Sequence, residues 1–375
     1  MESGQNGGPA ACGGPTKTVQ ASLKFNIIYI PGMTKYLKPF VASLLSSTDC
    51  EYRLVANGCF ADEQRLLASL CEQDPRLEYF VLSADEIIPH DKALSLLQQQ
   101  EESDYFCFLD SDVFSKGNFL EELAPYLGQC SAVFSAPPLW CRSQDLVIAP
   151  DWPEMYGQYI HTSDGLCLGC SFFAIYDNRA LTEFVESTGI TFSTYNWHEL
   201  PPQYQDRLIR MNLKKRTYDT GKVLNILLQD HGKKLLYVES PSLFHLGSMT
   251  AFFAGNMNRL FRGRFPQRLS LRYQDFRRHT GVLRRRALTM IGIASPVKRG
   301  VASSEFFRMV KIRAAVSHFF LELLRSLATD RPFERTLNVG APEVERNVQA
   351  ATEEIKAIWK ANGFAAHPED VRAQQ

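Results

Sequence analysis

The sequence predicts an α/β fold, a doubly wound and mainly parallel sheet flanked by helices. Over residues 23–109, short apolar runs of strand length alternate with segments that carry a helical apolar stripe. The last run, 105–109, is apolar throughout and continues directly into Asp110, Ser111 and Asp112. A fully apolar run of this length is typical of a strand that is buried on both faces of a parallel sheet. Hydrophobic residues make up 45% of the chain and charged residues 22%, as in globular proteins.

The first half of the predicted domain consists of three β-α units followed by a fourth strand. Pro31-Gly32 ends the first strand, Asn57-Gly58 ends the second, and Asp62 is the predicted N-cap of the second helix. A strict alternation of this kind favours right-handed crossovers between parallel strands. The predicted strands are 23–30, 51–56, 77–82 and 105–109, and the predicted helices are 36–46, 62–72 and 92–101.

The second half is predicted to be less regular and rich in aromatic residues. Gly169 interrupts an apolar strand over 165–176, and Tyr218-Asp219-Thr220-Gly221 opens a late helix that ends near His231. A following strand leads to Phe244-His245-Leu246-Gly247. The remaining predictions are helices at 119–127, 178–186, 267–280 and 304–327, strands at 131–136 and 233–239, and loops at 140–165 and 188–216.

Asp110 and Asp112 are the first candidates for a functional site. Residues i and i+2 of an extended chain point to the same side, so the two carboxylates converge beyond the end of the fourth strand. Open α/β sheets bind their ligands at the carboxyl ends of their strands. Two converging carboxylates repel each other unless a cation or a proton lies between them. Oxygen ligands suit Mg²⁺ or Mn²⁺, and Mg²⁺ is commonly shared with substrate phosphates.

Leu-Asp-Ser-Asp at the end of an apolar strand resembles the DxD motif of nucleotide-sugar glycosyltransferases of the GT-A fold, family-2-like. The resemblance extends to the order of elements, because in these enzymes three β-α units lead into the DxD strand. It implies a Rossmann-like GT-A fold in which Asp112 and Asp110 are metal ligands and Asp110 also contacts the ribose or a metal-bound water. His245 corresponds to the histidine that completes the metal site in many members, with Mn²⁺ or Mg²⁺ as the metal.

The same resemblance implies a catalytic base at the start of the late helix, the place of Asp219. In inverting members an acidic residue there deprotonates the acceptor hydroxyl. Glu199 and Asp164 are the alternatives, because they lie in the two aromatic loops that would cover an acceptor. A retaining enzyme would need no such base, and Asp219 would then be an N-cap only.

For the nucleotide, the resemblance points to the ends of the first strands. Family members place uridine contacts at the positions of Pro31 and Asn57, which favours UDP over GDP as the donor nucleotide. Many relatives carry Asp where this chain has Asn57, so the identity of the base stays open. Lys92 lies in a segment similar to the family's Gly-Lys-Ala and would meet a phosphate or the base, while Asp110 and Ser111 are the other predicted donor contacts.

The charge of the chain is unevenly distributed. The net charge is zero, yet residues 259–313 contain 15 Lys or Arg and only two acids. Such a region suits an anionic partner: a membrane surface, a lipid-linked acceptor or a charged polysaccharide. Alternatively, it is a helical hairpin that packs on the domain or forms a homodimer. No nucleic-acid recognition motif accompanies the charge, so we expect no nucleic-acid partner.

Domain organisation and compartment follow from composition. We expect a disordered leader at 1–22, a GT-A domain at 23–256 with halves 23–115 and 116–256, a basic helical region at 257–364 and a disordered tail at 365–375. Nine cysteines without a regular framework indicate free thiols in a reducing compartment. With no predicted membrane span or secretory signal, we expect a cytoplasmic protein, peripheral at the membrane through the basic segment 259–313.

The functional hypothesis is a metal-dependent, inverting glycosyltransferase of polysaccharide biosynthesis that uses a nucleoside-diphosphate sugar and a glycan or lipid-linked hydroxyl. A nucleotidyltransferase shares the sheet and the carboxylate-bound metal, but its Gly-rich basic loop has only a poor counterpart in Pro31-Gly32-Met33-Thr34. A dehalogenase-type phosphatase places its Asp-x-Asp on the first strand, not the fourth. A non-catalytic carbohydrate-binding subunit of the same fold is the third alternative.

Overall fold

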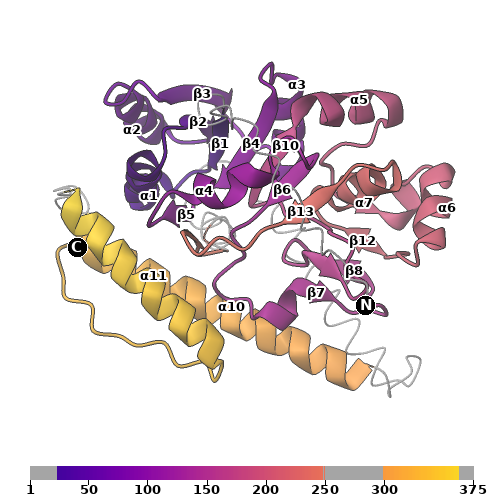
Figure 1. Cartoon of the computed structure of the whole chain (residues 1–375). Helices are drawn as coiled ribbons and strands as arrows, with labels where there is room; N and C mark the ends of the chain where they lie inside the picture. Colours follow the sequence, from indigo (N-terminus) through magenta and orange to yellow (C-terminus); the bar gives the residue numbers. More distant parts are fainter. Residues whose placement is uncertain (1–22, 248, 250–298, 363–375) are drawn as a thin grey trace, which may run out of the picture.

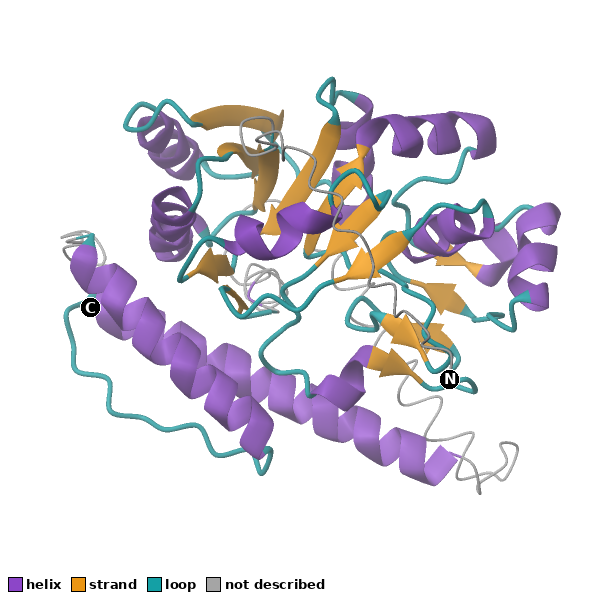
Figure 2. Cartoon of the chain, viewed as in Figure 1, coloured by secondary structure: helices purple, strands orange, loops and turns teal. Residues whose placement is uncertain are grey.

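The computed structural model describes residues 23–247, 249 and 299–362, with a seven-stranded sheet at the centre and helices around it (Figure 1 and Figure 2). In sheet order the strands are β13 (Leu235–Tyr237), β6 (Ala132–Phe134), β10 (Phe173–Asp177), β4 (Tyr105–Asp110), β1 (Lys24–Tyr29), β2 (Glu51–Asn57) and β3 (Leu77–Ser83). β1 is parallel to β2 and β4, β2 is parallel to β3, and β6 is parallel to β13. Only β10 runs antiparallel to its neighbours. The predicted mainly parallel, doubly wound sheet is therefore confirmed.

The β-α alternation of the first half is also confirmed. The three helices are α1 (Thr34–Ser47), α2 (Ala61–Cys71) and α3 (His90–Gln99). The prediction that Asp62 caps α2 is wrong, because the N-cap position falls on Phe60. An apolar side chain cannot accept a hydrogen bond there, and Glu63 instead reaches back to the Phe60 amide at 3.1 Å.

The second half contains more regular structure than predicted. The segment 188–216, expected to be a loop, includes α6 (Pro202–Arg210), and the strand expected at 165–176 begins only at Phe173 because Gly169 adopts a left-handed conformation. The other elements are β5 (Val113–Ser115), α4 (Phe119–Leu123), η2 (Ala124–Tyr126), η3 (Ser143–Leu146), β7 (Val147–Ile148), β8 (Glu154–Met155), β9 (His161–Thr162), α5 (Asn178–Thr188), β11 (Tyr195–Asn196), η4 (Trp197–Glu199), β12 (Thr217–Tyr218), α7 (Lys222–Asp230) and β14 (Leu243–His245).

β4 is buried on both faces, as its composition predicts. Phe106, Cys107, Phe108 and Leu109 are each at most 2% exposed. Burying an aromatic or aliphatic side chain of this size contributes roughly 1.5–3 kcal/mol, so the strand is firmly fixed in the sheet. Its position between β1 and β10 places its carboxyl end, and hence Asp110, at the middle of the sheet edge.

Two long helices follow the described part of the α/β unit. α10 (Arg299–Ala328) confirms the helix predicted at 304–327, whereas α11 (Pro342–Ala361) was not predicted. The two helices lie side by side and both contact α1 (Figure 1). The guanidinium of Arg313 on α10 lies 5.2 Å from the centroid of the Trp140 ring, which ties the pair to the second half. A hairpin packed on the domain is thus what the described residues form.

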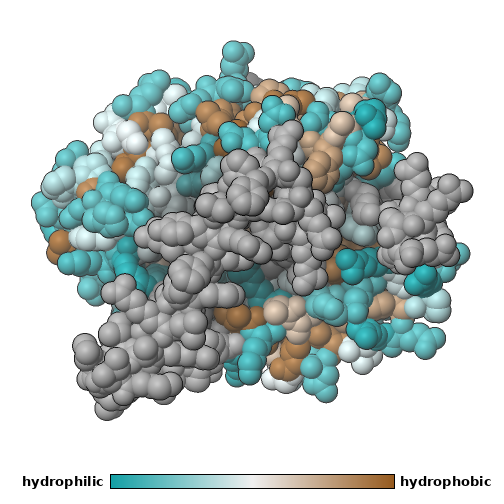
Figure 3. Space-filling model, turned by 180° about the vertical axis from the view of Figure 1, so that it is seen from behind, coloured by the Kyte–Doolittle hydropathy of each residue, from teal (hydrophilic) through white to brown (hydrophobic). Residues whose placement is uncertain are grey.

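The remaining predictions on the C-terminal region lie largely outside the described residues. These include the helix at 267–280, the boundary at 256, most of the basic segment, the leader and the tail. No helix within the described ranges combines the length and apolarity that crossing a bilayer requires. All eight described cysteines are free thiols. On the face drawn in Figure 3, the hydrophobic side chains form separate patches among hydrophilic ones.

Candidate active site

Asp110, Asp112 and His245 converge at the carboxyl end of β4. The Nε2 atom of His245 lies 3.3 Å from Oδ1 of Asp112 and 3.6 Å from Oδ2 of Asp110. Each residue offers one ligand atom, and these three atoms all lie within 4.8 Å of one another. The structure thus brings together the three residues that the sequence nominated as a metal site.

Strand pairing brings His245 to the two acids. β14 pairs with β5 in antiparallel register, which sets His245 opposite Val113, directly after Asp112. The Nδ1 atom of His245 donates to the carbonyl oxygen of Ala136 at 3.1 Å, because a carbonyl can only accept. The imidazole therefore presents the Nε2 lone pair to the acids when it is neutral. Ala136 has a φ of 57°, a strained value for a residue with a side chain, in the segment that orients the ring.

The facing atoms of the trio are buried and unsatisfied. Asp112 is 1% and His245 2% exposed, and neither Oδ1 of Asp112 nor Nε2 of His245 has a hydrogen-bond partner among the described residues. Burial disfavours the imidazolium, but the carboxylates of Asp112 and Asp110 outweigh it and raise the pKa of His245 to about 9. Buried polar atoms without a partner are costly, so the site is built to hold a positive charge. Two carboxylates and one imidazole suit Mn²⁺, and Mg²⁺ less well.

His90 is a site residue that the sequence analysis missed. It begins α3, and its Nε2 atom lies 3.7 Å from Oδ1 of Asp110, whereas His245 approaches Oδ2 of the same carboxylate. Its side chain is 37% exposed, so it can reach a ligand above the trio. The next residue, Asp91, accepts from the Thr194 amide at 2.9 Å and so links α3 to the second half. The only sequence signal for His90 was its place beside the Lys92 segment.

Asp219 is connected to Asp110 indirectly, through Gly157 and the segment 171–172. Its Oδ2 atom accepts from the Gly157 amide and its Oδ1 atom from the Thr220 amide, both at 2.9 Å. A Cβ placed on Gly157 would lie 3.6 Å from Oγ of Ser171, and the adjacent Phe172 accepts from the Asp110 amide at 2.8 Å. The N-cap of α7 is Gly221, so the carboxylate of Asp219 does not cap that helix.

The carboxylates of the two alternative bases, Glu199 and Asp164, each accept a hydrogen bond from a group in their own local turn. Oε2 of Glu199 accepts from the Asn196 amide at 2.8 Å, and the Thr162 hydroxyl donates to the carboxylate of Asp164. Asp219 is connected to Asp110 through Gly157 and the Ser171-Phe172 segment.

The predicted nucleotide contacts occupy different environments. Asn57 is 1% exposed, and its amide both donates to and accepts from the backbone of Ile88 at 2.8 Å. Pro31 is buried at the end of β1, whereas Lys92 is exposed on α3. Ser111 is buried between the two acids, and its hydroxyl has no partner among the described residues. Asn57 thus holds the 84–89 turn, and its direct contact with a nucleotide stays a prediction.

A buried carboxylate organises the turn after β1. Oε1 of Glu63 accepts from the Gly32 amide at 2.7 Å and from the Thr34 hydroxyl at 3.3 Å. Burial, the largest influence, raises the pKa of this carboxyl, although these donors oppose the shift. The amide and hydroxyl at this turn are consequently already bound to an anionic group.

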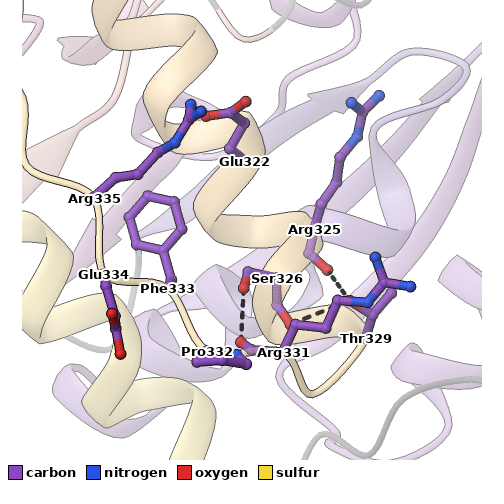
Figure 4. A pocket seen from close by; sticks show the side chains of 9 residues that line it. All are labelled: Glu322, Arg325, Ser326, Thr329, Arg331, Pro332, Phe333, Glu334 and Arg335. Carbon is purple, nitrogen blue, oxygen red and sulfur yellow. Dashed lines mark hydrogen bonds and ion pairs between the residues drawn. The ribbon is translucent and has the colours of Figure 1, made fainter.

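A separate pocket of about 440 Å³ lies at the C-terminal end of α10 (Figure 4). Several of its polar groups bind one another: Arg335 pairs with Glu322, and the Ser326 hydroxyl donates to the Arg331 carbonyl at 2.7 Å. Unlike the trio, it presents no cluster of metal-ligating side chains. Its residues are Glu322, Arg325, Ser326, Thr329, Arg331, Pro332, Phe333, Glu334 and Arg335.

Comparisons with known proteins do not identify the chain. No protein-family model matches it, and neither does any curated protein. It is similar to S. aureus TarS, with a TM-score of 0.34 and 14% identity over 64% of this chain, and spans only 39% of the length of that chain. A TarS fragment, residues 1–349, matches over 89% of this chain and 92% of the fragment, at a TM-score of 0.35 and 13% identity.

Two further solved structures are similar at the same level. The galactosyltransferase LgtC, in complex with donor and acceptor sugar analogues, has a TM-score of 0.34 and 14% identity over 57% of this chain and 73% of its own. The mannosyltransferase PcManGT from Pyrobaculum calidifontis, in complex with GDP-Man and Mn²⁺, has a TM-score of 0.38 and 11% identity over 92% of this chain and 84% of its own. Such distant similarity carries no argument about activity, which rests on the geometry of the trio.

Proposed function

We propose that this chain is a metal-dependent glycosyltransferase that moves a sugar from a nucleoside-diphosphate sugar to a hydroxyl of a glycan or lipid-linked acceptor. One observation carries the proposal. Oδ1 of Asp112 and Nε2 of His245, both buried and unsatisfied within the described residues, face each other 3.3 Å apart at the end of the central strand. This edge of an open α/β sheet is where nucleotides bind.

The residues present fit a divalent cation of the Mn²⁺ or Mg²⁺ type. Asp112 and His245 would hold it from the buried side, and Asp110 would share it with the donor diphosphate. A cation in this place supplies Lewis-acid stabilisation of the charge that develops on the leaving diphosphate. Nδ1 of His245 stays bound to the Ala136 carbonyl, so the ring keeps its Nε2 directed at the site.

Asp219 is the proposed base of an inverting reaction. The amides of Gly157 and Thr220 fix its carboxylate from two sides, and an oxygen lone pair on it takes the proton of the acceptor hydroxyl. The acceptor oxygen then bonds to the anomeric carbon of the sugar while the bond from that carbon to the diphosphate oxygen breaks. The nucleoside diphosphate leaves with the electron pair of that bond.

The proposed donor contacts lie on the first half of the sheet. Asn57 would shape the base pocket by holding the backbone of Ile88, and Pro31 would line it, with UDP favoured over GDP. The exposed Lys92 and the partly exposed His90 begin α3 and would face the diphosphate. The unsatisfied hydroxyl of Ser111 would donate to the donor or to Asp110.

The turn after β1 argues against the nucleotidyltransferase alternative. Such an enzyme would bind a triphosphate with free backbone amides and basic side chains after the first strand. Here Glu63 already occupies the Gly32 amide and the Thr34 hydroxyl. A buried carboxylate in that position would repel a phosphate.

The acceptor and the site of action also belong to the proposal. The basic segment 259–313 would contact an anionic surface or acceptor at the cytoplasmic face of a membrane, which would suit polysaccharide biosynthesis. Its described portion includes Arg308 and Lys311, both exposed on α10. A homodimer is the alternative use of this region.

A thermal-shift screen tests the proposed function directly. UDP-, GDP- and CMP-sugars and the nucleoside triphosphates are added with Mn²⁺ or with EDTA, and we expect one class of nucleotide sugar to stabilise the chain only when Mn²⁺ is present. At a hundred times its dissociation constant, a ligand adds about 2.7 kcal/mol to the free energy of unfolding, an easily measured shift. Equal stabilisation with EDTA, or stabilisation by nucleoside triphosphates alone, would contradict the proposal.

A further inference from the structure

Lys222, the first residue of α7, is a fully buried cation whose ammonium group donates to three backbone carbonyls. Its side chain is 0% exposed, and its Nζ atom donates to the carbonyl oxygens of Gly157, Tyr159 and Gly169 at 3.1, 2.5 and 2.6 Å. The three acceptors come from two segments that are separate in the sequence. One ammonium group therefore joins the 157–159 turn to the glycine that precedes β10.

Lys222 is the first of three polar side chains on one face of α7. Asn225 donates to the Leu168 carbonyl at 3.0 Å and Gln229 to the Cys167 carbonyl at 2.5 Å. Positions i, i+3 and i+7 share a helix face, so the helix binds three consecutive carbonyls, those of residues 167–169. Gly169 is held so closely that a Cβ there would lie 2.3 Å from Nδ2 of Asn225.

Both anchored segments lead to the proposed catalytic groups. The Gly157 amide donates to Asp219 and the Gly157 carbonyl accepts from Lys222, so the two side chains bind the same residue. Three residues after Gly169, Phe172 accepts from the Asp110 amide at 2.8 Å, and its ring lies 4.8 Å from the imidazole of His245.

A cation in this place carries a desolvation cost. Burial lowers the pKa of Lys222 to about 8, which means that the folded state disfavours its charge. The three carbonyl acceptors offset that cost, and removing the ammonium alone would leave them without their donor. What the ammonium adds over a methyl group is three simultaneous donors of fixed direction.

We infer that Lys222 is a positioning residue that fixes Gly157 and Gly169, and through them holds the carboxylate of Asp219 and the Phe172 side of the metal site in one relative arrangement. The inference rests on the proposed function, in which those two groups act on the same sugar transfer. A displacement of one of them by about 1 Å would be enough to reduce turnover substantially.

The test compares three variants of the full chain. Lys222→Met removes the donors and keeps the length of the side chain, and Lys222→Arg keeps the charge and several donors. Lys215→Met is the matched control, because Lys215 is also buried, at 3% exposure, and donates to the Pro150 carbonyl at 2.7 Å. Each variant is measured for Mn²⁺-dependent turnover, donor KM, and amide hydrogen exchange over 156–172.

We expect Lys222→Met to lower kcat by roughly 10–100-fold with donor KM within about threefold of wild type, because the donor half is untouched. Lys222→Arg should recover part of that loss, and Lys215→Met should change neither parameter. Exchange over 156–172 should quicken in Lys222→Met alone. Turnover in Lys222→Met equal to that of the control would overturn the inference.

The two hypotheses fail in different ways. If wild type shows no Mn²⁺-dependent nucleotide binding, the proposed function is wrong whatever Lys222 does. In that case the exchange data still decide the positioning: unchanged protection over 156–172 in Lys222→Met overturns it, and a selective loss of protection supports it.

Discussion

Replacing Asp112 by Asn tests whether the trio shares one positive charge. The substitution keeps the shape of the side chain and removes the carboxylate 3.3 Å from Nε2 of His245, leaving Asp110 at 3.6 Å. Asp112 contributes the largest of the influences that raise the pKa of His245 from 6.5 to about 9, against the opposing effect of burial. Without it, we expect that pKa to fall by about 1–2 units, equivalent to about 1.4–2.7 kcal/mol.

The same variant should lose its metal. Mutating a residue that only hydrogen-bonds a metal ligand typically changes the metal affinity by roughly 10–100-fold. We therefore expect Mn²⁺ binding to weaken at least roughly 100-fold when a direct ligand is lost. The pKa is measured by NMR titration of the ¹⁵N-labelled imidazole in metal-free protein, and Mn²⁺ affinity by paramagnetic resonance of the free ion.

Asp91→Asn is the matched control for Asp112→Asn. Asp91 lies on α3 and accepts from the Thr194 amide, so its loss removes a nearby carboxylate that does not face His245. We expect the control to leave both the imidazole pKa and the Mn²⁺ affinity within error of wild type. An unchanged pKa together with Mn²⁺ affinity within twofold of wild type in Asp112→Asn would refute the assignment of the trio.

Three further predictions concern proton linkage, packing and chemistry. Because the folded-state pKa of His245 is raised, its stabilising effect is present below pH 6.5 and is lost as the pH rises through about 9. Urea unfolding in EDTA should therefore show a loss of about 1.5 kcal/mol between pH 6.5 and 8, and none in His245→Gln. Gly169→Ala should lower the free energy of unfolding by about 3 kcal/mol, since the new Cβ would lie 2.5 Å from a Phe134 ring carbon. Gly189→Ala, with a similarly positive φ but open space around the new Cβ, should lower it by about 1 kcal/mol in the same assay. Asp219→Asn should lower kcat by about 10²–10⁴-fold in a coupled assay for released nucleoside diphosphate, with Mn²⁺ affinity unchanged; kcat within threefold of wild type would rule out a base at this position.

The central strand and its acids were predictable because the signal is local. Five apolar residues that run into Asp-Ser-Asp specify both a buried strand and two carboxylates on one side, whatever lies around them. The nomination of His245 came from a family resemblance, since nothing in the local sequence indicates the pairing of β14 with β5. That pairing joins segments more than a hundred residues apart.

The supporting residues could not be predicted, because the contacts that define their roles are not local in the sequence. Lys222 and Glu63 act on backbone groups of remote segments, and a backbone carbonyl or amide leaves no trace in a sequence. Asn57 had the right place for a ligand contact, yet its amide binds the backbone of Ile88. The cap of α2 was misassigned because a local rule favours Asp62, whereas the fold uses Glu63 for the cap and the β1 turn together.

Anomalous diffraction at the manganese edge, from crystals grown with Mn²⁺ and UDP, tests the central claim most directly. We predict a single strong peak within coordination distance of Asp112 and His245, with the diphosphate on its far side. A peak elsewhere on the chain, or nucleotide bound away from the end of β4, would contradict the account.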